Sequence, residues 1–490
     1  MVEIYGEADC DSVDCNHDHS WSCRSIIKMN KKLSIGGAFV GGHMKTFITD
    51  EYQTAAVQSL GRLVKHASVL DESDSGAGHP FGKKVLGALE EVLELCQELG
   101  FKTFQDPEGY YGYAETGEGE KLFGLLCHMD VVPAADQAGW ETDPFEMVER
   151  DGLLIGRGTQ DDKGPSMASL YAVKALMDAG VTFDGRIRFI FGTDEETLWR
   201  CLDKYNEKEE AITMGFAPDS HFPLNYAEKG LLQAYLTGPG TNEFTLHAPG
   251  ALNVVPDRAA YTSEKLAEVK AALTAHGFAY EETEKGISVQ GKSVHAMAAP
   301  EGTNATLRLA IALAEVFDFK PLDFLGKLVQ ENATGENVVG KVMDEQSGEL
   351  TMNFTDVEIT PEHTKIGVDM RLPVTIDKDE LAEKLATQAA AYQLEYKQYD
   401  WLNPLYVPVE SELIQTLLAT YREITGDMTE PMVSGGATFA RTMQNCVAFG
   451  AMFPETQDYM HQANEQWAIA DLRKTMEIYA EAIYRLCAVK

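Results

Sequence analysis

The sequence has no long hydrophobic run, and none of its apolar stretches reaches the about eighteen residues that a membrane-crossing helix needs. It also lacks a basic start followed by an apolar stretch, which is the pattern of a secretion signal. From these two absences we expect a cytoplasmic protein with no membrane partner.

Positive charge is scarce, because 41 lysines and arginines face 77 acidic residues and leave a formal net charge of −36. A surface of this sign repels polyanions, which argues against nucleic acid and acidic membranes as partners bound through general electrostatics. Partners are therefore expected to be small molecules or to make local contacts. An acidic composition also simply keeps a protein dispersed in solution.

Cysteine is too sparse, at 8 in 490 residues, to form a disulfide framework. Five cysteines stand singly in apolar or helical surroundings and are expected to be reduced thiols: Cys96, Cys127, Cys201, Cys446 and Cys487. The other three cluster with two histidines near the start: Cys10, Cys15, Cys23, His17 and His19. A small zinc site would use such ligands, although their spacing fits no closed zinc pattern. We instead expect residues 1–43 to be an atypical leader outside the fold, because a fresh helical pattern opens at Met44 after the flexible Gly41-Gly42.

A chain of 490 residues exceeds the usual size of one hydrophobic core, so at least two domains are expected. In the first half, stretches with helical spacing alternate with continuous apolar runs typical of buried strands. The predicted helices are 54–69, 81–99 and 164–179, and the predicted strands are 121–129 and 187–191. This alternation predicts an α/β sheet whose polar residues gather where strands end.

After Tyr226 the pattern changes to short strand-like stretches separated by turn residues. Here we predict helices over 264–276, 305–316 and 378–392, a strand over 366–372 and a return linker over 401–404. Long helical periodicity resumes over 411–424 and 468–486. A smaller domain, 227–402, is therefore expected to be inserted between 44–226 and 403–490, and an internal duplication within it is an open alternative.

His128 and Asp130 end the apolar strand of the first half. Residues two apart in an extended chain point to the same side, so an imidazole and a carboxylate share one edge of the sheet. This arrangement suits a metal ligand held by an acidic partner, although a lone His-x-Asp often arises by chance.

A glycine-rich turn, Gly156–Gly164, contains two adjacent acids, Asp161 and Asp162, and opens a helix. Capping the helix is the commoner use of an acid at this position. Two adjacent carboxylates repel each other, however, and a bound cation would remove that penalty.

Three consecutive acids, Asp194, Glu195 and Glu196, follow a hydrophobic strand. Successive side chains there point in different directions, so one glutamate can bind a metal while its neighbour faces a water. A solvated acidic loop is the alternative. Asp219 follows another apolar segment, and His461 precedes the last predicted helix.

Two imidazoles and three carboxylates thus stand at or near predicted strand ends: His128, Asp161, Glu196, Asp219 and His461. Nitrogen and oxygen ligands without a thiolate suit zinc, cobalt or manganese. Five ligands exceed what one catalytic zinc needs. Two metals sharing a bridging carboxylate, about 3.5–4 Å apart, would use all five.

These residues, in this order, resemble the metallopeptidase family of bacterial dipeptidase V, whose wider relatives include aminoacylases, carnosinases and succinyl-diaminopimelate desuccinylases. The resemblance covers residues 44–490 and is most specific in three segments: Leu125–Pro133, Gly156–Pro165 and Phe191–Glu196. It implies a catalytic α/β domain with a mixed central sheet and helices on both faces, and an inserted α+β lid domain.

The resemblance also implies roles for the acidic and histidine residues. Two zinc ions, or manganese or cobalt in their place, would share Asp161; His128 and Asp219 would complete one site, and Glu196 and His461 the other. Asp130 would orient His128, and Glu195 would be the general base for a water held between the metals.

In the lid, His295 within Gly291–Ala296 matches a histidine that stabilises the oxyanion, although a buried core histidine is its default interpretation without the family. Asn253 matches an asparagine lining the same site, and Arg371 matches the residue that binds the terminal carboxylate of the substrate. Gly435 and Gly436 match less closely a loop of backbone donors. Met297 departs from the small residues common there and could narrow the pocket.

The preferred hypothesis is hydrolysis of dipeptides with a free amino terminus, including β-alanyl or D-configured ones. Deacylation of N-acyl amino acids is the alternative within hydrolases, because it needs the same metals. A non-catalytic binding protein would have lost a ligand or the base, and all of them are present. Since the long insertion could close the site of its own chain, we expect a monomer with a small peptide substrate.

Overall fold

The structure, a computed structural model, describes residues 46–134 and 138–489. The expected leader, residues 1–43, lies outside the described residues. All of the described residues belong to one compact unit.

Residues before Gly230 and after Leu402 form the first set of elements. Its helices are α1 (Asp50–Val64), η1 (Glu72–Asp74), α2 (Lys83–Glu98), α3 (Lys163–Asp178), α4 (Arg200–Lys208), α10 (Glu412–Thr425), η4 (Phe439–Thr442) and α11 (Ile469–Cys487). Its strands are β1 (Lys102–Gln105), β2 (Tyr111–Glu118), β3 (Leu122–His128), β4 (Val148–Arg150), β5 (Leu153–Ile155), β6 (Gly185–Gly192), β7 (Met214–Ala217), β8 (Ser220–His221), β9 (Asn225–Glu228), β20 (Leu405–Tyr406), β21 (Met432–Ser434), β22 (Cys446–Ala448), β23 (Ala451–Met452) and β24 (Gln466–Ala468).

The main sheet is mixed, with strand order β1-β2-β6-β3-β7-β22-β9-β20 and β21 beside β9. Its centre is parallel, because β3 pairs in parallel with both β6 and β7, and β22 with β7. Every residue of β3 is buried, as expected for a parallel strand covered on both faces. The carboxyl ends of β3, β6 and β7 consequently meet at one edge.

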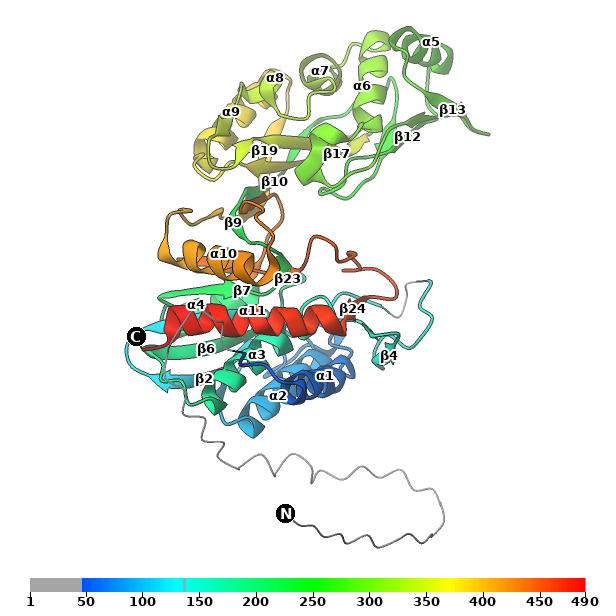
Figure 1. The fold of residues 1–490 in the computed structure, drawn as a ribbon. Helices are drawn as coiled ribbons and strands as arrows, with labels where there is room; N and C mark the ends of the chain where they lie inside the picture. Colours follow the sequence, from blue (N-terminus) through cyan, green and yellow to red (C-terminus); the bar gives the residue numbers. More distant parts are fainter. Residues whose placement is uncertain (1–45, 135–137, 490) are drawn as a thin grey trace, which may run out of the picture. The chain divides into compact units, whose positions relative to one another are not determined.

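Helices cover both faces of this sheet (Figure 1). A Cβ on Gly112 of β2 would meet Leu89 and Leu93 of α2, so α2 approaches on that face. The neighbouring Tyr111 points the other way and packs edge-on against Tyr205 of α4. Since successive residues of a strand face opposite sides, α2 and α4 lie on opposite faces.

Residues Gly230–Leu402 form the second set of elements. Its helices are α5 (Leu266–His276), η2 (Ala296–Glu301), α6 (Ala305–Val316), α7 (Lys320–Asp323), η3 (Phe324–Val329), α8 (Glu336–Val339) and α9 (Lys378–Ala391). Its strands are β10 (Gly230–Pro239), β11 (Leu246–Ala248), β12 (Arg258–Tyr261), β13 (Tyr280–Glu282), β14 (Ile287–Gln290), β15 (Met343–Asp344), β16 (Gly348–Glu349), β17 (Thr351–Ile359), β18 (His363–Leu372) and β19 (Glu395–Leu402). Its main sheet runs β11-β17-β18-β10-β19 and is antiparallel throughout.

Buried apolar side chains form two separate clusters. One draws its fully buried members from residues 48–224 and 405–487, and the other from 232–394. The chain therefore leaves the first core once and returns to it once, as an inserted domain requires. The boundaries 226/227 and 402/403, and the internal duplication, stay proposals.

The predicted helices and strands are present, with ends shifted by a few residues. The first helix ends at Val64 rather than at residue 69. Trp401 and Leu402 are not linker residues, because they end β19 and pair with β10. Their tight fit explains the difference, since a Cβ on Gly230 would lie 2.8 Å from the Trp401 ring.

The five cysteines expected to be thiols are free and buried. No helix within residues 46–134 and 138–489 is long and apolar enough to cross a membrane. The predicted fold class, an α/β domain with a mixed sheet and an inserted second domain, is confirmed.

Candidate metal centre

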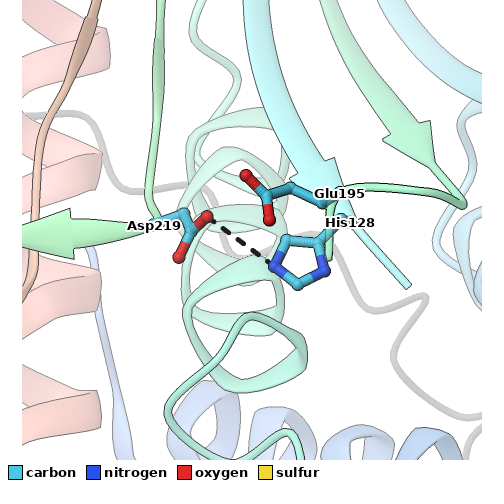
Figure 2. Close-up of side chains that lie close together, drawn as sticks. All are labelled: His128, Glu195 and Asp219. Atoms are coloured by element: carbon cyan, nitrogen blue, oxygen red, sulfur yellow. Dashed lines mark ion pairs between the residues drawn. The ribbon is translucent and has the colours of Figure 1, made fainter. Parts of the chain in front are cut away.

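The predicted metal ligands lie at the carboxyl-end edge of the main sheet. His128 is the last residue of β3. Glu195 and Glu196 follow β6, which ends at Gly192, and Asp219 follows β7, which ends at Ala217. Because these strands run in parallel, their ends bring the side chains together, and Figure 2 shows Glu195 and Asp219 turned toward the His128 ring.

Asp161 lies between the two histidines. Its Oδ1 is 2.9 Å from Nε2 of His128, and its Oδ2 is 2.9 Å from Nε2 of His461. The same nitrogen of His461 is 3.1 Å from Oε2 of Glu196. One carboxylate thus presents one oxygen to each imidazole, as a carboxylate shared by two cations would.

Glu195 and Asp219 lie on the His128 side. Oδ2 of Asp219 is 3.7 Å from Nε2 of His128. Potential ligand atoms form two groups, each within 4.8 Å, one of His128, Glu195 and Asp219 and the other of His128, Asp161 and Glu196. The side chains predicted from distant parts of the sequence are therefore brought together.

The tautomer of His128 follows from its backbone contact. Its Nδ1 is 2.9 Å from the carbonyl oxygen of Asp130, which can only accept a hydrogen bond. Nδ1 therefore carries the proton, and Nε2 is left to bind a cation. The Asp130 carboxylate lies farther away, with Oδ1 3.6 Å from Nδ1, and its Oδ2 accepts the Glu196 N–H at 3.0 Å.

The acidic side chains repel one another when no cation is present. Burial and the neighbouring charge of Asp219 raise the pKa of Glu195 well above its ordinary value. Burial and the charge of Asp161 also raise the pKa of Glu196. Burial and Asp161 likewise raise the pKa of Asp219. Dications would reverse this cost.

The histidines compensate part of this repulsion. Burial alone would lower the pKa of His128, but hydrogen bonds to Asp130 and Asp161 raise it well above its usual value. Hydrogen bonds to Asp161 and Glu196 raise the pKa of His461 to about 11. Oε1 of Glu196 is buried without a hydrogen-bond partner among the described residues. This donor set fits a pair of divalent cations.

Asn253 and His295 lie side by side in the inserted domain. The residue after Asn253, Val254, forms a β-bridge with His295, and the carbonyl of Asn253 accepts the Ala296 N–H at 2.8 Å. His295 is exposed, so the default interpretation as a buried core histidine is wrong. Partial burial and the charge of Arg371 lower its pKa.

Arg371 is buried and held from two sides. Its Nε and Nη2 donate to the two oxygens of Asp369 at 2.7 and 3.1 Å, and its Nη1 donates to the carbonyl of Gly435 at 2.7 Å. The neighbouring Gly436 carbonyl accepts from Arg441 at 2.7 Å, while its N–H donates to Ser434. Glycine is required at position 435, because a Cβ would lie 2.5 Å from Cβ of Met297.

The sequence matches one protein family over most of its length. Residues 124–485 match the peptidase family M20/M25/M40. A Staphylococcus haemolyticus protein named "Putative dipeptidase" is 34% identical over 464 residues, which cover 89% of this chain and 98% of that protein. The chain belongs to the M20/M25/M40 peptidase family.

Solved structures of M20 peptidases share this fold. Human carnosine dipeptidase 1 is 17% identical with a TM-score of 0.54, covering 88% of this chain and 96% of that one. A Bacillus subtilis protein described as a dinuclear metal-binding peptidase from the M20 family is 11% identical with a TM-score of 0.51, covering 90% and 99%. At these identities the likeness shows the fold alone.

Not all predicted site residues of this M20 peptidase meet at one point. Within the part of the chain that the structure describes, no hydrogen bond or ion pair joins Asn253, His295 or Arg371 to the five predicted ligands. Burial lowers the pKa of Arg441, and the charges of both Arg371 and Glu195 also act on that pKa. The roles of the inserted-domain residues therefore stay predictions.

Several buried charges that support the site were not predicted. Asp162 accepts the His128 N–H at 3.2 Å and the Ser166 hydroxyl at 2.9 Å, and so supports both a ligand and helix α3. Glu465 and Arg157 form a fully buried ion pair at 2.7 Å. Two supporting acids left a signal: Asp162 is adjacent to Asp161 in the glycine-rich turn, and Asp369 stands two residues before Arg371 on one face of a strand. Pairs distant in sequence leave none.

Proposed function

We propose that this chain is a metal-dependent dipeptidase that hydrolyses the peptide bond of dipeptides with a free amino terminus. The observation that carries the proposal is the position of Asp161, whose two oxygens each lie 2.9 Å from a different histidine. Family membership and the dipeptidase names of relatives support the same class of reaction.

Two divalent cations fit this centre. Asp161 would be shared, His128 and Asp219 would complete one site, and Glu196 and His461 the other. Nitrogen and oxygen donors favour zinc, with manganese or cobalt as alternatives. When bound, such cations supply Lewis acidity and bring the pKa of water close to neutrality.

Glu195 is the proposed general base. Its carboxylate approaches His128 and Asp219 without forming an ion pair with a lysine or arginine in the described residues. It would take a proton from the attacking water and pass it to the departing amine. Asp130 would assist through its backbone carbonyl, which sets the His128 tautomer.

His295 and Asn253 are proposed to stabilise the developing oxyanion. His295 accepts a hydrogen bond from the Met297 N–H at Nδ1, 3.2 Å away, which leaves the proton on Nε2. Because His295 is an exposed residue, that N–H is able to donate to a carbonyl oxygen. Because no hydrogen bond or ion pair joins these residues to the ligands in the part of the chain that the structure describes, the inserted domain is proposed to act as a lid that approaches them in the reacting complex.

Arg371 is proposed to bind the terminal carboxylate of the dipeptide. A guanidinium carries five N–H donors, and Asp369 and Gly435 use three of Arg371's. Two donors remain, which is the number that a bidentate carboxylate needs. The proposed contribution of Gly435 and Gly436 is a loop of backbone donors around the substrate, in which the Gly436 N–H already donates to the Ser434 hydroxyl.

A substrate panel tests the function. Purified protein loaded with zinc, manganese or cobalt should release amino acids from alanyl and β-alanyl dipeptides, and a chelator should abolish the release. N-acetyl amino acids are the comparison, because a deacylase uses the same metals. Cleavage of the acetylated set alone would replace the dipeptidase proposal with the deacylase, and cleavage of neither would favour a binding protein.

The assembly proposed for this enzyme is a monomer, because the long inserted domain could close the site of its own chain. Light scattering of the purified protein tests it, and a dimer would contradict it. Cytoplasmic location stays a prediction.

A further inference from the structure

Glu465 is a buried carboxylate next to the proposed metal centre that binds no cation in the proposed scheme. Its side chain is fully buried. Oε1 accepts three backbone N–H groups, from Gly158 at 3.0 Å, Gln160 at 2.8 Å and Asp161 at 3.2 Å. Oε2 accepts from Arg157 at 2.7 Å. One carboxylate therefore binds the whole turn that carries the shared ligand Asp161.

The same turn holds the loop that carries His461. The Gln160 side chain donates to the carbonyl of Gln457 at 2.9 Å and accepts the Tyr459 N–H at 2.8 Å. Arg157 also donates to the carbonyl of Gln462 at 3.2 Å. These contacts join residues about three hundred positions apart in the sequence, on both sides of His461.

His461 needs such support because of its backbone. Its φ is 61°, and that of Asn464 is 59°. Non-glycine residues with such a positive φ are strained and persist only where surrounding contacts specify them. The side chain of His461 is 55% exposed, so its own burial does not fix it.

We propose that Glu465 is a positioning residue that sets the relative placement of Asp161 and His461, and thereby the metal affinity of the centre. The inference rests on the proposed metal-dependent function, but not on which peptide is cleaved. Charge-assisted hydrogen bonds to four groups in one turn give the carboxylate the required stiffness. The loss of comparable outer partners in metal sites lowers metal affinity about 10–100-fold.

Two substitutions at this position separate geometry from charge. E465A removes the acceptor and should lower zinc affinity, measured by competition with a chelator in the full chain, about 10–100-fold. E465Q keeps one oxygen able to accept the three backbone N–H groups and should bind zinc more tightly than E465A. Cobalt absorption in the visible region should change shape in E465A, because the ligands are displaced.

E228Q is the matched control. Glu228 is equally buried, pairs with Arg441 at 3.0 Å and accepts the Thr438 N–H at 3.1 Å. Among the described residues, no hydrogen bond or ion pair joins Glu228 to a proposed ligand. It should lower thermal stability while leaving zinc affinity and the cobalt spectrum unchanged. The proposal would be overturned if E465A keeps the zinc affinity and cobalt spectrum of the wild type and loses only thermal stability, as E228Q does.

A third variant keeps the test decisive should E465A not fold. Q160A removes the two side-chain contacts to the His461 loop without altering charge, and should lower zinc affinity about 10-fold. Unchanged affinity in Q160A would overturn the proposal as well. A wild-type protein that binds two metals but cleaves no dipeptide would refute the proposed function and leave this inference standing on its metal titrations.

Discussion

Glu195 and Glu196 are adjacent glutamates with different proposed roles. Substitution of Glu195 should remove the general base, whereas substitution of Glu196 should remove a metal ligand. Glu195→Gln keeps the shape of the side chain and removes its ability to take a proton. The proposed ligands of both sites remain, since His128, Asp161 and Asp219 still surround the first position. Glu196→Gln instead removes the negative charge of a proposed metal ligand, whose Oε2 lies 3.1 Å from Nε2 of His461.

The size of the effect follows from the role. General acid–base catalysis contributes about 10²–10⁴-fold to a rate. At 1.36 kcal/mol per tenfold, this corresponds to about 3–5 kcal/mol of lost transition-state stabilisation. For E195Q the loss should appear in kcat, with two metals per chain retained. For E196Q metal content should fall toward one, and activity should recover in part when metal is added.

Metal content by elemental analysis and steady-state hydrolysis of alanyl dipeptides are measured on the same preparations. The proximity of Glu195 to His128 and Asp219 also allows Glu195 to be a ligand, and the two roles differ in outcome. Loss of a metal from E195Q would show that Glu195 is a ligand. Near-normal kcat in E195Q would refute the base assignment altogether.

Three further predictions concern the carboxylate pocket, the lid contact and protons. Arg371→Lys keeps the charge but loses the planar fork, so KM for dipeptides should rise about 10-fold, the order of one hydrogen bond to a charged group. The KM for dipeptide amides, which lack the terminal carboxylate, should not change. An equal rise of KM for the amides would contradict carboxylate binding. Gly435→Ala places a Cβ 2.5 Å from Cβ of Met297 and should lower kcat/KM about 10-fold or more. Adding Met297→Gly to this variant should restore kcat/KM. If kcat/KM is not restored, the contact with Met297 is not the cause of the loss. His461, with its pKa raised to about 11, is protonated at pH 7 without metal and must lose that proton to bind a cation. Calorimetry in buffers of different ionisation enthalpy should therefore show proton release on metal binding, and the metal affinity should rise with pH. Metal binding without proton release would contradict a protonated His461.

Much of the fold could be predicted because its patterns are local. The periodicity of α3 and α6 is confirmed to within a residue or two at each end. The uninterrupted apolar run ending at His128 is confirmed as a buried parallel strand. Ends were less predictable, because they depend on contacts with distant residues rather than on neighbours in the chain. The first helix ends at Val64, where Lys163 Nζ donates to the carbonyl oxygens of Leu63 and His66, and Leu402 pairs with β10.

The candidate site divides in the same way. His128, Asp161, Glu196, Asp219 and His461 were predicted as a group, and the structure brings them together. Their individual roles stay predictions. The fully buried acids Glu465 and Glu228 were missed, because a carboxylate that accepts backbone N–H groups looks in the sequence like any other surface acid.

The sequence by itself determined the periodicity of the helices, the buried central strands and the motifs in which imidazoles and carboxylates follow strand ends. These features depend on residues close together in the chain, so they can be predicted without knowledge of the fold. Only the tertiary structure decided that Asp161 stands between His128 and His461, and that Glu465 binds the turn of Asp161. The contacts of Asp161 with His461 and with Glu465 join segments about three hundred residues apart, whose proximity arises from packing and from burial that no local pattern records.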